Sequence, residues 1–183
     1  MRSTKKIGTF SSIRSLTFAA MLTAMSVVIG IFCKSFLNFG GGAFRITFEN
    51  LPIIMSGILF GPVVGGLVGA ATDVISYFYS TQSFAIDPIV TIGAAAVGLT
   101  AGLVSRYLIK TQSYRQIILS GASAHLIGSL LIKTTRLCSL YGSVFLWRIP
   151  LYLMIAPTEI LVICLLYKNS ALRKIFDSIR KQK

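Results

Sequence analysis

Two arginines are the residues of this 183-residue chain best suited to binding chemistry, because each lies beside a long apolar run. Arg45 precedes the run that begins at Leu51, and Arg148 follows Trp147 at the start of another. A guanidinium group presents a planar fork that pairs with carboxylates, and an indole ring offers a face for stacking. The pattern indicates a binding site for an anion that also carries a flat ring.

Asp73 is the next candidate, since it is the single charge between Leu51 and Tyr79. A lone carboxylate in such a run usually faces a cavity or a charged partner. Here it would face either the ligand or one of the arginines, Arg45 or Arg148. Tyr77 follows one helical turn later on the same face. The remaining candidates near these groups are Asn50 and Arg136.

Other kinds of chemistry find little support in the sequence. The three cysteines share no metal-ligand spacing and there is one histidine, so we expect no metal site. No phosphate loop and no nucleophile–base pair is visible. A small enzyme acting on lipid headgroups would depend on Asp73, His125 and Glu159, which lie in different apolar runs. We therefore expect a binding protein without a cofactor, and the roles of Glu49, His125 and Glu159 stay open.

The elements that must position these residues are membrane helices. Hydrophobic residues make up 54% of the chain and form several runs that are long enough to cross a bilayer. The run from Leu51 to Tyr79 is too long for one span, and Gly61-Pro62 is a natural break within it. We predict an all-α protein with a single membrane domain over residues 1–183 and six transmembrane helices. The predicted spans are 14–33, 50–60, 62–79, 88–107, 116–133 and 148–168.

The basic residues orient these spans. With six spans and both termini cytoplasmic, 13 of the 18 lysines and arginines lie on the cytoplasmic side, whereas five spans would place 7 inside and 11 outside. The positive-inside rule favours six. The net charge of +13 then mostly marks the cytoplasmic face, so no nucleic-acid partner is expected. The candidate binding residues fall toward the opposite, external side.

Small residues recur four apart in several spans, as in Gly65-x-x-x-Gly69 and Ala94-x-x-x-Gly98. Such spacing lets helix backbones approach closely, and we interpret most of it as packing within the chain. Ala20 and Ala24 are different, because the first span needs partners on only one face. We interpret this pair as a strip that seats a helix of another protein.

One stretch carries a family resemblance. The motif Arg45-Ile-x-Phe-x-Asn50-x-Pro52, followed by the Gly61-Pro62 hairpin, resembles the entry to the second and third helices in substrate-binding S subunits of energy-coupling factor (ECF) vitamin transporters. The resemblance covers nearly the whole chain and is closest to the folate type. The pair Ala20-x-x-x-Ala24 is similar to the motif with which S subunits dock on the coupling subunit. Glu49 departs from the folate-type pattern, which has a small residue there.

The resemblance implies a high-affinity folate-binding subunit in a bacterial plasma membrane, with folate or a reduced folate as substrate. Its partners would be a transmembrane coupling subunit and two ATPase subunits. The arginines would neutralise the glutamate tail, and Asn50, Asp73 and Trp147 would hold the rings. The alternatives are an S subunit for another vitamin or a stand-alone organic-anion carrier. The full set of expected ligand-binding residues is Arg45, Asn50, Asp73, Tyr77, Arg136, Trp147 and Arg148.

Overall fold

The computed structural model describes residues 13–39, 44–79, 87–108 and 113–169, and nearly all of them are helical. A helix or a continuous helical run lies over each range predicted as a span. Four of these stretches are long and apolar enough to cross a membrane, and α2 and α3 are shorter apolar helices. The helices are α1 (Ile13–Phe36), α2 (Asn50–Phe60), α3 (Pro62–Phe78), α4 (Pro88–Leu103) with the π-helix η2 (Val104–Leu108), α5 (Tyr114–Ala124) with the π-helix η3 (His125–Thr134), α6 (Thr135–Tyr141), the 3-10 helix η4 (Ser143–Trp147) and α7 (Arg148–Lys168).

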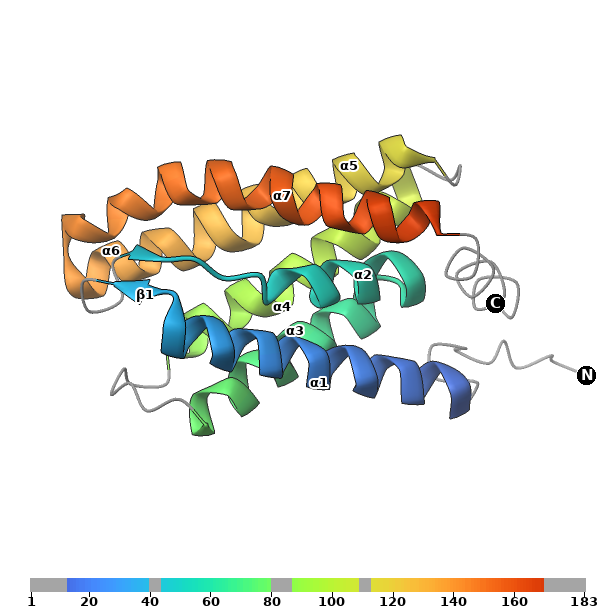
Figure 1. The fold of residues 1–183 in the computed structure, drawn as a ribbon, viewed down its shortest axis with the longest axis horizontal. Coiled ribbons are helices and arrows are strands. Elements are labelled where there is room, and N and C mark those ends of the chain that lie inside the picture. The colour runs from blue at the N-terminus through green and yellow to red at the C-terminus, as the bar shows by residue number, and fades with distance from the viewer. Residues whose placement is uncertain (1–12, 40–43, 80–86, 109–112, 170–183) are drawn as a thin grey trace, which may run out of the picture.

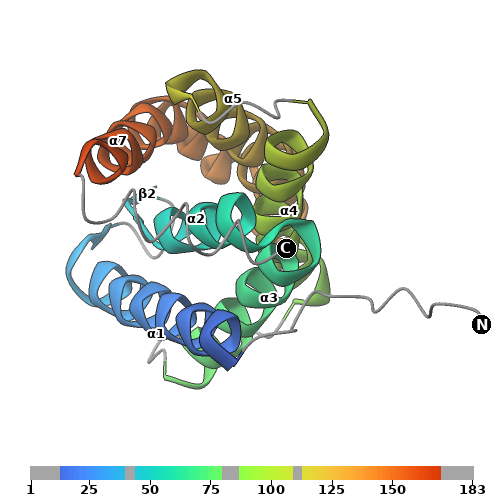
Figure 2. The same ribbon diagram turned by 90° about the vertical axis from the view of Figure 1, so that its right-hand side faces the viewer.

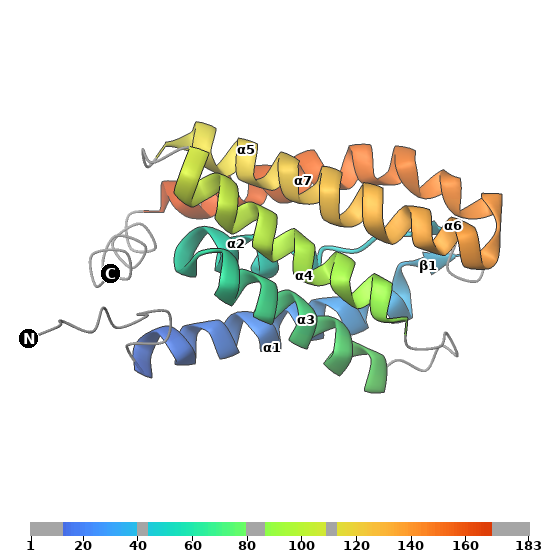
Figure 3. The same cartoon turned by 180° about the vertical axis from the view of Figure 1, so that it is seen from behind.

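The helices form a bundle in which α2 occupies the centre. Figure 2, which looks along the bundle, shows α2 surrounded by its neighbours, and α2 contacts α1, α3, α4, α5 and α7. A helix that is apolar on all sides is expected to be buried, and almost every residue of α2 is. Figure 3 shows α4 crossing between α3 and the α5–η3 run from behind. Residues at the start of α2 are therefore in the interior of the molecule.

Successive helices begin at the end of the bundle where the previous helix finishes. The start of α1, the α2–α3 turn and the end of α7 lie at one end (Figure 1). The other end holds β1 (Asn38–Phe39), which pairs antiparallel with β2 (Phe44–Arg45), together with α6 and the start of α7. The predicted ligand residues 45, 136, 147 and 148 all belong to elements at this second end.

The predicted break at Gly61-Pro62 is present. α2 ends at Phe60, Gly61 has a φ of +91°, and α3 begins at Pro62. Glycine adopts this left-handed conformation without the steric cost of a Cβ, and proline suits the first helical position because its missing N–H would have no helical partner there. The two residues together reverse the chain in a minimal turn.

Glycines let α2, α3 and α4 approach until their backbones touch. A Cβ added to Gly65 would lie 2.5 Å from the Gly98 carbonyl oxygen and 2.6 Å from the Gly57 Cα. Gly69 meets the Ala94 carbonyl in the same way. The small residues spaced four apart therefore pack within the chain, as the sequence predicts for these helices.

Large apolar side chains cover the outside of the bundle. On α7 alone, Leu153, Met154, Leu161 and Leu165 are each more than half exposed. The interior, by contrast, contains serines, threonines, an asparagine, a histidine, a lysine, an arginine and two glutamates. A soluble domain would show the opposite distribution. The surface is suited to lipid.

Candidate functional site

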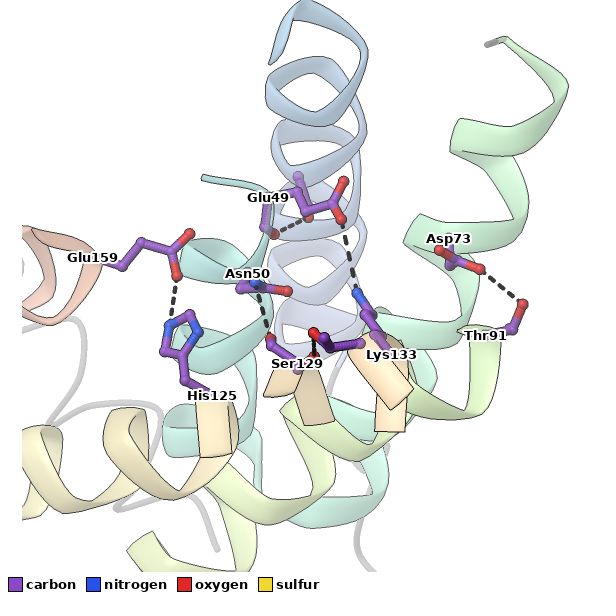
Figure 4. Close-up of polar contacts among 10 residues, drawn as sticks. Glu49, Asn50, Asp73, Thr91, His125, Ser129, Lys133 and Glu159 are labelled. Atoms are coloured by element: carbon purple, nitrogen blue, oxygen red, sulfur yellow. Dashed lines mark hydrogen bonds and ion pairs between the residues drawn. The ribbon is translucent and has the colours of Figure 1, made fainter. Parts of the chain in front are cut away.

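A line of polar side chains runs along the buried face of η3. His125, Ser129 and Lys133 are four residues apart and are all buried. Residues at this spacing share one face of a helix, and here that face points at α2 and α7 (Figure 4). The Thr134 hydroxyl donates to the Ser129 carbonyl over 3.0 Å. Helical segments of the π type are frequent at functional sites.

Glu159 of α7 pairs with His125 at the deep end of this line. Their Oε2 and Nε2 atoms are 2.7 Å apart, and Glu159 is completely buried. Close packing fixes the helices next to the pair, because a Cβ on Gly121 of α5 would lie 2.6 Å from the Ile160 side chain. The acid and the imidazole are therefore held together inside the bundle.

Glu49 pairs with Lys133 at the other end of the line. The Lys133 Nζ atom lies 3.7 Å from Glu49 Oε1, and both side chains are buried. Ser26 of α1 donates its hydroxyl hydrogen to the Glu49 carbonyl oxygen over 2.5 Å. Gly30 of α1 leaves room for the carboxylate, since a Cβ there would lie 2.9 Å from Glu49 Oε2. The pair joins the start of α2 to α1 and η3.

Asn50 lies between the two ion pairs (Figure 4). It is 1% exposed, and its Nδ2 group donates to the Ser129 hydroxyl over 3.4 Å. Its Oδ1 atom has no hydrogen-bond partner among the described residues. Buried amide oxygens are normally satisfied, so an open acceptor here is typical of a site that receives a donor from a ligand.

The predicted residues at the start of α7 point in different directions. Arg148 is buried, at 6% exposed, whereas Trp147 is 60% exposed. Arg45 lies in β2 opposite Asn38, and its side chain is outside the described part of the chain. β2 contacts α7, so the backbone segments that carry the two arginines are neighbours.

Two other predicted residues, Asp73 and Arg136, take part in contacts between helices, and Tyr77 contacts its neighbour on the same helix. The Thr91 hydroxyl of α4 donates to Asp73 Oδ2 over 2.7 Å, which ties α3 to α4. Tyr77 is half-buried on α3, and its ring meets that of Phe78 edge-on, with centroids 5.9 Å apart. Arg136 donates from Nε to Asp87 Oδ2 over 2.7 Å, and this links α6 to the N-terminus of α4.

Asp87 also caps α4, because its Oδ1 atom accepts from the Ile89 backbone N–H over 2.8 Å. Burial acts to raise the pKa of Asp87. The hydrogen bond and charge of Arg136, together with the backbone N–H donors of α4, outweigh this effect and hold the pKa of Asp87 below its usual value.

Sequence reasoning did not assign the buried line to the site. It left Glu49, His125 and Glu159 open and did not include Lys133, the last residue of a predicted span, among the ligand-binding residues. The available signal was the spacing of His125, Ser129 and Lys133 within an otherwise apolar run. Within the residues that the structure describes, no group of three or more metal-ligating side chains is present.

Ala20 and Ala24 are both exposed on α1, whereas Ala19 is buried. α1 itself lies at the edge of the bundle (Figure 2). The pair is thus absent from the internal packing of the described chain.

Comparison with known proteins places this arrangement in a family. Residues 14–177 match the family described as "ECF transporter, substrate-specific component". The chain belongs to this family. It is therefore a multi-pass membrane protein of a transport system, and its part in that system is substrate binding rather than catalysis.

Two curated relatives are similar in sequence. The folate transporter FolT of Clostridium novyi (strain NT) is 25% identical over 162 residues, which cover 86% of this chain and 92% of FolT. The uncharacterized protein MG098 homolog of Mycoplasma pneumoniae (strain ATCC 29342 / M129 / Subtype 1) is 30% identical over 115 residues, or 60% of this chain. The chain spans only about a quarter of that second relative, 23%.

Two solved structures share the fold. The crystal structure of FolT bound with folic acid has a TM-score of 0.64 at 21% identity, and covers 82% of this chain and 90% of that one. The S component of a bacterial ECF transporter has a TM-score of 0.60 at 23% identity, over 85% and 94% of the two chains.

Proposed function

We propose that this chain is the folate-binding S component of an ECF transporter. The observation that carries the proposal is the buried polar line from Glu159 to Lys133. Polar and ionisable groups inside a membrane bundle cost free energy, so they are typically kept for a ligand or an ion. The near full-length similarity to a folate transporter, and the fold shared with a FolT bound to folic acid, support folate as that ligand.

Folate is an elongated molecule with a flat pterin ring at one end and a glutamate with two carboxylates at the other. Arg148 and Arg45 are at the end of the bundle where β2 meets α7, and their guanidinium groups would bind the glutamate. The open acceptor on Asn50 would receive a ring donor deeper in the bundle. Trp147, Tyr77, Asp73 and Arg136 remain expected members of the site or of its border.

The proposed topology has six spans with both termini in the cytoplasm. The alternation of helix ends supports it, because the start of α1 and the end of α7 lie at the same end of the bundle (Figure 1). That end also has the basic residues Arg106, Arg115 and Lys168 near the ends of their helices, as the positive-inside rule requires of the cytoplasmic side. The ligand would then enter from the external end.

Transport would depend on a membrane-embedded coupling subunit and two ATPase subunits. The exposed pair Ala20 and Ala24 on α1 supports a helix-docking face for the coupling subunit. This chain would supply affinity and specificity, and its partners would supply the energy.

Titration of the purified protein with folic acid, a reduced folate, riboflavin and thiamine tests the proposal. Saturable binding of the folates alone is the expected result. If another vitamin binds saturably and neither folate binds, the folate assignment is overturned, and the family assignment stands. ATP-independent uptake by vesicles that contain only this chain would instead favour a stand-alone carrier.

A further inference from the structure

Glu159 differs from the other described carboxylates in having side-chain oxygens that are buried and have no hydrogen-bond partner among the described residues. Asp73 accepts from Thr91, Asp87 accepts from Arg136 and from the α4 backbone, and Glu49 faces Lys133. Glu159 lies 2.7 Å from His125 through Oε2 only. Its Oε1 atom has no hydrogen-bond partner in the described part of the chain.

A buried carboxylate oxygen without a partner needs a hydrogen-bond donor. Glu159 is 0% exposed, so bulk water does not satisfy it, and a buried acceptor without a donor is costly. An ionised carboxylate has about four lone-pair sites. His125 contacts one oxygen of the group at 2.7 Å, and the carboxylate can still accept two parallel N–H donors. The site therefore suits a group with two adjacent N–H bonds.

The position of Glu159 along α7 gives the length of the ligand that would reach it. Arg148 and Glu159 are both buried on α7 and are eleven residues apart, or about 16 Å at 1.5 Å per residue. Asn50, whose Oδ1 atom has no partner among the described residues, lies between the His125–Glu159 and Glu49–Lys133 pairs (Figure 4). A guanidinium group thus lies at one end of this stretch of α7 and a carboxyl group at the other. A ligand with carboxylates at one end and N–H donors at the other end matches this order.

We propose that Glu159, oriented by His125, binds the donor edge of the pterin ring, which is formed by the 2-amino group and the neighbouring ring N3–H. This assignment rests on folate being the substrate. The two N–H bonds are parallel and adjacent, and they match the two oxygens of a carboxylate in a bidentate contact. Glu159 is then the residue that selects a 2-amino-4-oxo ring over rings without that edge.

The test uses the purified full chain and two ligands: folic acid and an analogue in which a methyl group replaces the 2-amino group. The wild type is expected to bind folic acid more tightly than the analogue by about 10- to 100-fold, the range for a hydrogen bond to a charged group. Glu159→Gln is expected to lose most of its affinity for folic acid and little for the analogue, so that the preference disappears. Ser56→Ala is the matched control, because Ser56 is also fully buried but bonds only to the Ile53 carbonyl of its own helix. It should keep the preference.

The outcomes separate this inference from the proposed function. If the wild type binds neither ligand, folate is not the substrate. If the wild type binds folic acid and Glu159→Gln keeps both the affinity and the preference, the role of Glu159 is overturned and the folate assignment stands. Equal binding of the two ligands by the wild type overturns the inference even if the variant fails to fold. Glu159→Asp provides a second variant. Its side chain keeps the carboxyl group but is one methylene shorter, so the carboxyl group lies farther from the ring and folic acid should bind more weakly.

Discussion

At the scale of single residues, two of the arginines predicted to bind the ligand differ in their surroundings. Arg136 is engaged with Asp87 at the surface of the bundle, whereas Arg148 is buried at the start of α7. The planar fork of a guanidinium suits a carboxylate. We therefore expect Arg148, rather than Arg136, to bind the glutamate of the ligand.

Arg148→Ala is expected to weaken folic acid binding by roughly 2–5 kcal/mol, because it leaves a ligand carboxylate buried and without its partner. Calorimetric titration of the folded variant measures the loss. Pteroic acid, which has the rings but not the glutamate, should bind the variant and the wild type almost equally. An equal loss for both ligands would show that Arg148 supports the rings or the fold instead.

The contact between Asp87 and Arg136 predicts a dependence of stability on pH. Because the pKa of Asp87 is lower in the folded protein than in the unfolded chain, the contact stabilises the fold above the unfolded pKa. That contribution is lost as the pH falls through the lowered folded value. Thermal unfolding of the wild type and of Asp87→Asn, followed from pH 6 to pH 3, should show curves that converge at the acid end. Curves that stay parallel throughout would mean that the contact contributes nothing.

Single residues also show what the sequence could not predict, namely the partners that these residues meet in the fold. The arginines and Asp73 were recognisable because each interrupts or borders an apolar run. Their partners were not, since Thr91 and Asp87 are separated from Asp73 and Arg136 by 18 and 49 residues and meet them only through tertiary packing. The same holds for Glu159 and His125, which the sequence places in different spans.

At the scale of elements, helix positions follow closely from the apolar runs, and helix ends follow less closely. The Gly61-Pro62 break was readable because its conformational effects are local. The run that begins at Tyr114 continues to Tyr141, past the predicted end at residue 133. Lys133 and Arg136 look like the end of a span in the sequence, but Glu49 pairs with Lys133 in the interior and Asp87 pairs with Arg136.

The contact between α3 and α4 leads to a prediction about helix packing. Gly98→Ala places a methyl group against the Gly65 backbone, which cannot move aside as a side chain would. It should destabilise the bundle by roughly 1–3 kcal/mol or more. Gly66→Ala is the control, because its Cβ would find ordinary contacts of 3.6 Å with Ala95 and Leu99. Thermal unfolding in detergent distinguishes them, and equal melting temperatures would contradict the packing argument.

At the scale of the whole molecule, the bundle combines an apolar surface with a polar interior. Composition alone predicts this inversion, because so many apolar side chains in a small protein need lipid around them. The central position of α2 was not predictable in this way, since it depends on which of several apolar helices the others surround. Yet that position is what brings Glu49 and Asn50 against η3.

The outer face of α1 provides the prediction that separates ligand binding from transport. Ala20 and Ala24 are exposed and lie one turn apart, whereas the α1 residues that contact the buried polar line, Ser26 and Gly30, are buried. A tryptophan at either position should hold a partner helix away, because close approach depends on small side chains. Ala20→Trp and Ala24→Trp are therefore expected to keep wild-type folate affinity but to lose uptake and co-purification with the coupling subunit. Leu161→Trp, on the exposed face of α7, is the matched control and should retain all three.

Ligand titration and partner pull-down on the same preparations measure the outcome. If folate binding is lost together with partner binding, the alanine face supports the fold. If Ala20→Trp and Ala24→Trp keep both, the coupling subunit docks elsewhere.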